Sequence, residues 1–445
     1  MKINRRNFLK TSAVFAGWSI LPTGAWSNPL NSRFCTAHIG VGGMGGRDLG
    51  QVSRHPNVQV VGLADVDRTI LNQVGVNSAG GNRFGDAARF TDYREMLRTL
   101  GDKVDGVVIS TPDHTHYPAT LMAMNLGKAV YCQKPLTHEI AEAYELAALA
   151  KEKGLVTQMG IQLHSSNANR MTVDLLQQGI IGKVSKVYVW SNKNWGSDDA
   201  SAYTGSDPVP ETLDWNLWLG SAPAHPYLNG NYHPGQWRKH FDFGCGTLGD
   251  MGIHIIDTPY SALNLSAPHS VKVTCRESNH VSHPTKNIVE LKFPGTKHTT
   301  NSLQMTWFDG ADAPKTAGQT NPDLQLEAGK KLPSQGAMYI GEDGHRLLMP
   351  HSSGPQPLPR SLLGGVVKPQ LKPVNHYHQW VDAGMDNGTC SAPFEYAGPL
   401  TSTVLLGVVG NRFPEQTLQW DGDAMRFTNN EAANQLVSRT HRTGY

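Results

Sequence analysis

The sequence predicts an α/β fold of two domains, a doubly wound parallel sheet followed by an α/β domain with an open, mainly antiparallel sheet. Three observations predict this architecture. A glycine-rich loop follows an apolar strand near residue 40, strands and helices alternate up to about residue 162, and the later strands follow one another without long helices between them. The predicted domains span residues 33–162 and 163–445.

The composition is that of a globular chain. Its 445 residues are 39% hydrophobic and 17% charged, which allows a large core in about two domains. The formal net charge of +2 comes without long basic runs, so we expect a small-molecule partner and no nucleic acid. The five cysteines form no CxxC pair or metal-ligand cluster, and their odd number leaves at least one thiol unpaired in a monomer.

The N-terminal residues resemble an export signal. Arg5 and Arg6 are paired, an apolar run extends from Thr11 to Leu21, and the small-residue stretch GAWSN follows. We predict a twin-arginine signal peptide over residues 1–27 and therefore a periplasmic protein without stable membrane insertion after signal removal. The alternative is a basic start followed by a buried helix.

The first glycine-rich loop has the pattern of a nucleotide-binding unit. In CTAHIGVGGMGGRDLG, the glycines allow a tight turn, a close approach of the backbone to a pyrophosphate, and close packing of helix on strand. A second strand, VQVVGLADVD, ends on Asp65, where a carboxylate would meet a ribose 2′-hydroxyl. We therefore predict a Rossmann dinucleotide-binding domain that prefers NAD to NADP, although Arg68 lies nearby; the alternative is a glycine-rich turn alone. The predicted cofactor contacts in this part are Gly40, Gly42, Gly43, Met44, Gly45 and Asp65.

Polar residues follow two further strands of this domain. VDGVVIST and KAVYCQ predict buried parallel strands, while YREMLRTL, PDHTHYPATLMAMNLG and HEIAEAYELAALAKEKG predict helices. Ligands bind beyond the carboxyl ends of strands in such sheets, and this is where Thr111, Pro112, Gln133 and Lys134 fall. We expect these four residues at the cofactor, with Pro135 fixing the turn that holds Lys134.

The second domain is predicted from its strands. KVSKVYVWSN, SVKVTCRES, IVELKFPG, TNSLQMTWF and AMYIGEDGHRLLM have strand patterns, and their succession favours antiparallel pairing in one broad sheet. One face of this sheet would cover a ligand site or a helix, and the other would pair subunits in a homo-oligomer, a dimer or a tetramer. PHSSGPQPLPRSLLGG is predicted to be a surface excursion.

Asp250 and His254 are candidates for acid-base chemistry. They lie four residues apart in the predicted helix of GTLGDMGIHIIDTPYSAL, which places both on one face. Oxidation of a secondary alcohol needs a base for the hydroxyl proton, and histidine titrates in a useful range. Lys134 would stabilise negative charge on the same oxygen. The alternative is that Asp250 caps the helix and His254 is a core histidine.

Four motifs together resemble the Gfo/Idh/MocA family: GVGGMGGRD, STPDHTH, QKPL and GDMGIHIID. The resemblance covers nearly all of the chain after the signal. It implies an NAD(P)-dependent oxidoreductase of sugars, cyclitols or related compounds, with Lys134, Asp250 and His254 as catalytic residues and with His114 and His116 as cofactor contacts. The family usually has glutamate where this chain has Gln133, which keeps hydrogen bonds but not the charge.

A wider set of residues is predicted to contact substrate. His164 follows the last strand of the first domain, and the loop NYHPGQWRKHFD has the polar and aromatic side chains that bind sugars; an ordinary surface loop is the alternative. The predicted substrate contacts are His164, Tyr232, His233, Trp237 and Arg238. We predict no metal site.

The resulting hypothesis is an exported NAD(H)-dependent oxidoreductase that retains its cofactor and transfers hydride at a secondary alcohol of a sugar, polyol or derivative. A redox-neutral NAD-dependent glycoside hydrolase, lyase or epimerase, working through a transient keto sugar, is the alternative. A non-catalytic carbohydrate-binding relative is a third reading.

Overall fold

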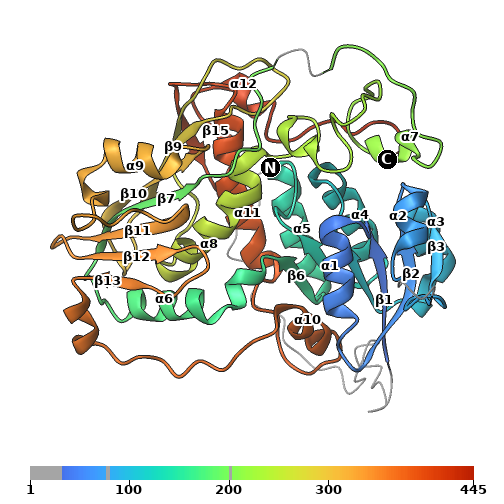
Figure 1. The fold of residues 1–445 in the computed structure, drawn as a ribbon, viewed down its shortest axis with the longest axis horizontal. Helices are drawn as coiled ribbons and strands as arrows, with labels where there is room; N and C mark the ends of the chain where they lie inside the picture. Colours follow the sequence, from blue (N-terminus) through green and yellow to red (C-terminus); the bar gives the residue numbers. More distant parts are fainter. Residues whose placement is uncertain (1–32, 77–80, 200–202, 445) are drawn as a thin grey trace, which may run out of the picture. The chain divides into compact units, whose positions relative to one another are not determined.

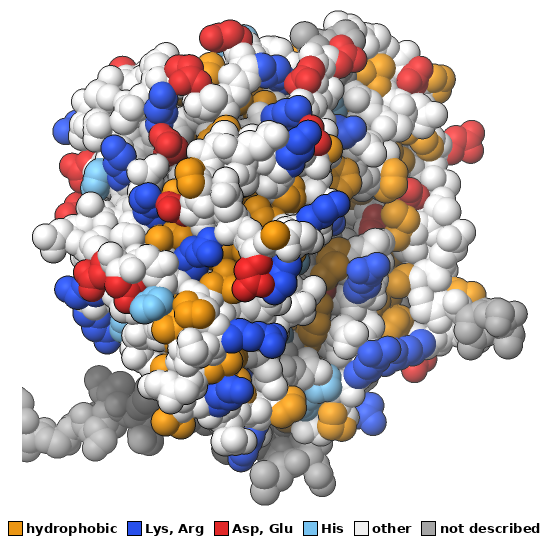
Figure 2. Space-filling model, turned by 60° about the vertical axis from the view of Figure 1, so that its left-hand side comes forward, with side chains coloured by type: hydrophobic (Ala, Val, Ile, Leu, Met, Phe, Trp, Pro, Cys, Tyr) orange, Lys and Arg blue, Asp and Glu red, His pale blue; other side chains and the backbone are white. Residues whose placement is uncertain are grey.

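The computed structural model describes residues 33–76, 81–199 and 203–444, and the predicted signal peptide lies outside these residues. Residues from Arg33 onward form one compact unit that contains two β-sheets (Figure 1). No helix among the described residues combines the length and apolar character needed to cross a membrane. On the face drawn in Figure 2, acidic and basic side chains are interspersed, with hydrophobic side chains between them.

The first sheet is parallel and has six strands in the order β3-β2-β1-β4-β5-β6. This order, in which the chain moves outward from β1 in both directions, is that of a Rossmann fold. The strands are β1 (Phe34–Ile39), β2 (Val58–Ala64), β3 (Ala88–Phe90), β4 (Gly106–Ile109), β5 (Ala129–Gln133) and β6 (Thr157–Gly160). All residues of β4 and β6 are buried, because helices cover both faces of a parallel sheet.

Among the described residues, five α-helices connect these strands. They are α1 (Gly43–Val52), α2 (Arg68–Gln73), α3 (Tyr93–Leu100), α4 (Asp113–Asn125) and α5 (Ile140–Lys153). Local sequence explains where α5 begins and ends. Glu139 and Glu142 form a reciprocal capping box at its start, and Gly154 ends it in the left-handed conformation that glycine adopts without strain.

The second sheet is mixed and has nine strands in the order β13-β12-β11-β7-β10-β9-β8-β14-β15. Only β7 and β10 pair in parallel among its described ladders, so the prediction of a mainly antiparallel sheet is confirmed. The strands are β7 (Val184–Ser191), β8 (Ser270–Thr274), β9 (Asn287–Pro294), β10 (Thr299–Asp309), β11 (Gln335–Gly341), β12 (Arg346–Pro350), β13 (Gln356–Leu358), β14 (Thr417–Asp421) and β15 (Arg426–Phe427).

Two details of this sheet differ from the sequence prediction. AMYIGEDGHRLLM forms a hairpin of β11 and β12, because Gly344 takes a positive φ of 84° between them. The predicted surface excursion contributes the edge strand β13, which pairs with β12. An edge strand needs only one partner, so its short proline-rich sequence is compatible with pairing.

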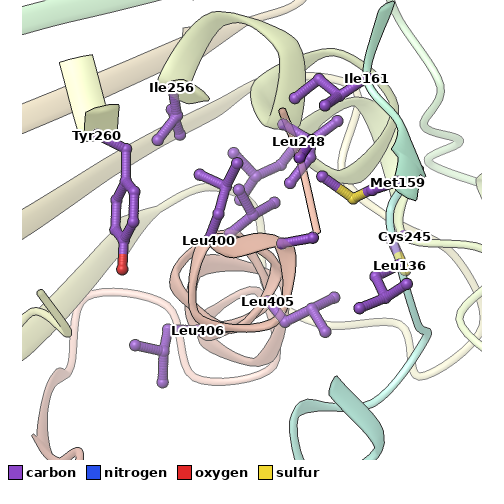
Figure 3. Close-up of a cluster of buried hydrophobic side chains, with 14 of the residues drawn as sticks. Leu136, Met159, Ile161, Cys245, Leu248, Ile256, Tyr260, Leu400, Leu405 and Leu406 are labelled. Carbon is purple, nitrogen blue, oxygen red and sulfur yellow. The ribbon is translucent and has the colours of Figure 1, made fainter. Parts of the chain in front are cut away.

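The helices of the second half are α6 (Asn167–Gln177), α7 (Trp215–Leu219), α8 (Ile253–Ala262), α9 (Ala313–Thr320), α10 (His376–Gly384), α11 (Phe394–Gly410) and α12 (Glu431–Asn434). A π-helical segment, η4 (Leu248–Gly252), runs directly into α8. Buried leucines of α11 lie in the same hydrophobic cluster as Met159 of β6 and Ile256 of α8 (Figure 3). The core therefore extends from the first sheet to the second without a boundary.

Helix α10 returns to the first domain. The Trp380 ring packs edge-on against Phe34 of β1 and Tyr131 of β5, with centroid distances of 5.4 and 5.9 Å. Trp380, Phe34 and Tyr131 are all at most 2% exposed. A segment far beyond residue 162 thus completes the core of the nucleotide-binding sheet.

Candidate active site

The glycine loop between β1 and α1 has the shape required for a close-lying ligand. Gly40 has a φ of 76°, and a Cβ there would lie 2.8 Å from the carbonyl oxygen of Ser110. At Gly45, a Cβ would collide with the carbonyl oxygen of Gly40, so α1 packs directly on the loop. No side chain caps α1, whose first residue is Gly43. Its first backbone N–H groups therefore remain for a bound anion such as a pyrophosphate, in agreement with an NAD site.

Asp65 lies at the end of β2, beside this loop. Its carboxylate accepts hydrogen bonds from the backbone N–H groups of Val41 and Asp67, both at 3.0 Å. Burial raises the pKa of Asp65, and these two hydrogen bonds oppose that shift. Arg68 donates instead to the carbonyl oxygen of Glu211, which directs its guanidinium toward the segment before α7. The placement supports a ribose hydroxyl as the partner of Asp65 and gives Arg68 another role.

The residues that follow β4 have two different kinds of surroundings. Pro112 precedes α4, and the buried Thr111 Oγ1 has no hydrogen-bond partner among the described residues, so a cofactor hydroxyl or amide would satisfy it. The ring nitrogens of His114 and His116 are hydrogen-bonded to main-chain carbonyl oxygens. His116 bonds to Pro135 and Thr111 at 2.8 and 3.0 Å, which ties the turns after β4 and β5 together.

His114 has a corresponding structural role. Its Nε2 lies 2.9 Å from the carbonyl oxygen of Trp218, and its Nδ1 lies 3.3 Å from that of Phe243. Burial lowers its pKa to about 3, so the ring is neutral. These contacts favour a positioning role for His114 and His116 over the predicted direct contact with the cofactor.

The Gln133 side chain contacts the main chain of the neighbouring lysine, where its Oε1 accepts from the Lys134 backbone N–H at 3.3 Å. Its Nε2 donates to Asp48 Oδ2 at 2.8 Å, and Asp48 also accepts from Ser110 Oγ at 2.7 Å and from Tyr377 OH at 3.0 Å. Asp48 is completely buried, and burial raises its pKa to about 6 despite the three hydrogen bonds and the charge of Lys134. The carboxylate beneath this strand end therefore comes from α1, and no sequence motif had indicated it.

Lys134 projects to the predicted catalytic aspartate. Its Nζ donates to Asp250 Oδ1 at 2.7 Å and to the Asp250 carbonyl oxygen at 2.8 Å. Trp195 Nε1 donates to the other carboxylate oxygen at 2.8 Å, and Arg238 Nε lies 3.5 Å from Oδ1. Burial would raise the pKa of Asp250, but the charges of Lys134 and Arg238 hold it well below its usual value. Asp250 is thus a permanent anion that holds Lys134, rather than a proton carrier.

His254 lies one helical turn beyond Asp250, at the start of α8. A π-helical segment that contains Asp250 runs directly into α8 before it, and the charge of Asp250 opposes the lowering of the His254 pKa. Burial and the charges of Lys134, His351 and Lys193 together lower the pKa of His254 well below its usual value. Its Nδ1 is buried without a hydrogen-bond partner among the described residues. A neutral imidazole in this position can accept a proton.

His164 lies in a short 3₁₀ helix after β6 (Gln162–Ser165) and contacts Asp257 of α8. Its Nδ1 is 2.9 Å from Asp257 Oδ1, and Tyr396 OH donates to the same oxygen at 2.5 Å. Burial opposes the charged form of His164, but Asp257 raises its pKa above the usual value. His164 and Asp257 line a cavity of about 290 Å³ between α6 and α8. His164 therefore faces a small cavity whose lining residues do not include Lys134, Asp250 or His254.

The residues of the loop predicted to bind substrate also differ from one another in their surroundings. Tyr232 is fully buried in an aromatic cluster with Trp218 and Phe243, and this placement favours packing over substrate contact. His233 Nε2 lies 3.1 Å from Asp67, near the Asp65 end of the site. Trp237 is buried, and its ring stacks under the Arg238 guanidinium at 4.2 Å. Arg238 is the member of this set that lies beside Lys134 and Asp250.

Several site residues were missed by the sequence analysis: Asp48, Lys193, Trp195, Asp257 and His351. Asp257 carried a signal, because it lies seven residues after Asp250 on the same helical face. The other four are brought in by contacts between distant segments. Among the residues described, no group of three or more His, Cys, Asp or Glu side chains is arranged to hold a metal ion.

Comparisons with known proteins agree with the fold. Residues 34–161 match a family model described as "Oxidoreductase family, NAD-binding Rossmann fold", and residues 168–294 match its C-terminal alpha/beta domain. A glycosyl hydrolase family 109 protein of Shewanella pealeana is 23% identical over 258 residues, which cover 53% of each chain. An inositol 2-dehydrogenase of Rubrobacter xylanophilus is 30% identical over 154 residues, which cover 34% of this chain and 42% of the relative. The chain thus spans about half or less of these curated relatives.

Solved structures share the fold. The WlbA dehydrogenase of Bordetella pertussis, solved with NADH and UDP-GlcNAcA, has a TM-score of 0.60 at 12% identity and covers 87% of this chain and 99% of its own. GenD2 from gentamicin A biosynthesis, solved with NAD, has a TM-score of 0.56 at 19% identity and covers 91% and 100%. The two family models together span more than half of the chain. The matched residues include the Rossmann sheet, its glycine loop, Lys134 and Asp250. The chain therefore belongs to the Gfo/Idh/MocA family of NAD-binding oxidoreductases.

Proposed function

We propose that this protein is an exported NAD(H)-dependent oxidoreductase that retains its cofactor and acts at a secondary alcohol of a sugar, polyol or sugar derivative. The observation that carries the proposal is the placement of Lys134, Asp250 and His254 at the carboxyl end of β5, on the sheet that carries the glycine cradle. The preference for NAD rests on Asp65, whose negative charge would repel a 2′-phosphate.

Each residue of this group has a separate task. Bound NAD would supply the hydride acceptor, and the chain would handle the proton and the oxygen. Neutral His254 accepts the hydroxyl proton, while the remaining N–H of Lys134 donates to the oxygen as negative charge develops on it. Asp250 and Trp195 fix the lysine in place. Return of the proton and hydride reverses the reaction.

Export and cofactor retention support one another. The periplasm is not expected to supply free NAD, so an exported enzyme would have to fold around the nucleotide beforehand and regenerate it with a second substrate. We propose periplasmic localisation from the arginine pair at Arg5 and Arg6 and the apolar run after it. Replacing both arginines with lysine should keep the protein in the cytoplasm, and unchanged export would contradict this part.

The central experiment denatures the purified protein and measures released nucleotide by absorbance and mass. Release of about one NAD per chain supports the proposal. Absence of nucleotide, together with no thermal shift on adding NAD, would exclude this function and the alternative below. Spectra of the holoprotein during addition of sugars and polyols would then follow hydride transfer in the site.

A redox-neutral glycoside hydrolase, lyase or epimerase is the second candidate, because glycosyl hydrolase family 109 proteins are among the relatives of this chain. A transient ketone would make the adjacent C–H acidic, so a substituent could leave before the hydride returns. This route uses the same lysine and histidine. Cleavage of a chromogenic glycoside by holoprotein, without net change in cofactor absorbance, would favour it.

We also propose a homo-oligomer, a dimer or a tetramer, formed through the face of the nine-stranded sheet that points away from the site. Light scattering of the purified protein tests this directly. A monomer at micromolar concentration would contradict it.

A further inference from the structure

The substrate side of the site offers hydrogen-bond donors and few acceptors. Both oxygens of Asp250 are occupied, one by Lys134 and Arg238 and the other by Trp195. Lys134 has three donors and uses two of them on Asp250. The groups left for a substrate are therefore mainly positive N–H groups.

Arg238 is held in a fixed position with donors to spare. Its guanidinium lies over the rings of Trp237 and Trp195, at 4.2 and 5.2 Å from their centroids. Besides the contact to Asp250, it donates from Nη1 to the Gly235 carbonyl oxygen at 3.3 Å. With its side chain 26% exposed, the guanidinium can still receive an anion.

Lys193 adds a further positive charge. It follows β7 by two residues, is exposed, and forms no ion pair with any residue in the described part of the chain. Two residues further on, Trp195 bonds to Asp250 and its ring lies under the Arg238 guanidinium, so Lys193 and Arg238 flank the same tryptophan.

The charge of Lys193 contributes to the lowered pKa values of His254 and His351, whose ring centroids lie 5.9 Å apart. Burial first, and then Lys193 and Lys134, lowers the pKa of His351 to about 4.

The nearby carboxylates do not cancel these charges toward the substrate. Asp48 and Asp113 are buried, and burial raises the pKa of both. Asp48 is used by its three donors, and Asp113 accepts from the backbone N–H of Cys245. Asp250 is the carboxylate of this group that is partly exposed, and it already faces two cations, Lys134 and Arg238.

We infer that the substrate of the proposed oxidoreductase is an anionic sugar, with a carboxylate or sulfate group bound by Lys193 and Arg238. The inference rests on the proposed function and adds the chemical class of the substrate. An anion there would also offset the charge that forms when His254 takes up a proton next to Lys134. The reaction site and the recognition site would then support each other.

The test compares matched ligands on the holoprotein, with bound nucleotide quantified first. Titration calorimetry would measure binding of glucuronate against glucose, galacturonate against galactose, and the 6-sulfates of both sugars. We expect at least one acid to bind about tenfold or more tightly than its neutral parent. The carboxylate and sulfate arms identify which anion is preferred.

Variants at the two ends of β7 supply the control. Lys193→Gln should remove most of this preference, whereas Lys183→Gln, an exposed lysine just before the strand, should keep it. Equal binding within every pair, no binding of any acid, or an unchanged preference in Lys193→Gln would overturn the inference. If nucleotide is bound and a neutral sugar is oxidised under these conditions, the proposed function stands and the anionic substrate is refuted.

Discussion

Replacing Gln133 with glutamate, the usual family residue at this position, tests the buried network around Asp48. In this chain the Gln133 amide donates to Asp48 Oδ2 at 2.8 Å. Gln133→Glu would put a second carboxylate where that donor stands, without changing the size of the side chain. We expect the native state to hold one extra proton between the two carboxyl groups.

The distance sets the size of the effect. Two unit charges 2.8 Å apart repel by about 6 kcal/mol at an effective dielectric constant of about 20, so a shared proton is the less costly state. Burial already raises the pKa of Asp48 to about 6. Above that pH, the native variant would bind one proton that the unfolded chain does not, so its free energy of unfolding falls by about 1.4 kcal/mol per pH unit.

Urea unfolding at about pH 6 and about pH 8 measures this slope. Relative to the unsubstituted protein, Gln133→Glu should lose about 3 kcal/mol more at the higher pH. The double variant Asp48→Asn, Gln133→Glu restores one carboxylate and one amide and should remove the added slope. Equal losses at both pH values, or a double variant that behaves like the single one, would refute the shared-proton reasoning.

Three further substitutions address the base, the lysine anchor and the core. His254→Ala should keep NAD binding but slow hydride transfer by a factor of about 100 to 10,000. The amount of nucleotide released on denaturation should therefore be unchanged while turnover is lost, and unaffected turnover would exclude the base role. Trp195→Phe deletes the donor to Asp250 Oδ2 and should lower kcat about tenfold at an unchanged melting temperature. If kcat and the pH-rate profile are both unchanged, this hydrogen bond does not contribute to catalysis. Leu405→Ala removes a side chain that is 1% exposed at the junction of both sheets and should cost about 2 to 5 kcal/mol in urea unfolding, while a loss under about 1 kcal/mol would mean that the site collapses around the gap.

Local patterns were sufficient for most of the fold. Hydrophobic periodicity predicts the alternation of β4, α4, β5 and α5, and caps such as Gly154 mark the helix ends. Both signals act over a few residues. The Lys134–Asp250 contact joins residues 116 positions apart, and only the motif resemblance brought it into the prediction. Packing between strands that are distant in sequence leaves no such local mark.

The histidines and Asp48 show why the rest could not be predicted. His114 follows a strand end, as expected, but its ring nitrogens meet carbonyls of Trp218 and Phe243, more than 100 residues later. Asp48 accepts a hydrogen bond from Tyr377, which lies 329 residues later in the chain. The residue types were visible in the sequence, while their partners depended on the tertiary fold.

The return of α10 also affects when the nucleotide site matures during synthesis. Trp380 fills the space between Phe34 and Tyr131, and Tyr377 bonds to the carboxylate under the glycine loop. A ribosome would therefore release the first sheet with an open hydrophobic face, and the cradle would become rigid only after the last quarter of the chain emerged. Nucleotide capture would follow completion of the polypeptide, so a truncated chain ending near residue 162 would be a poor NAD binder even though it contains every glycine of the motif.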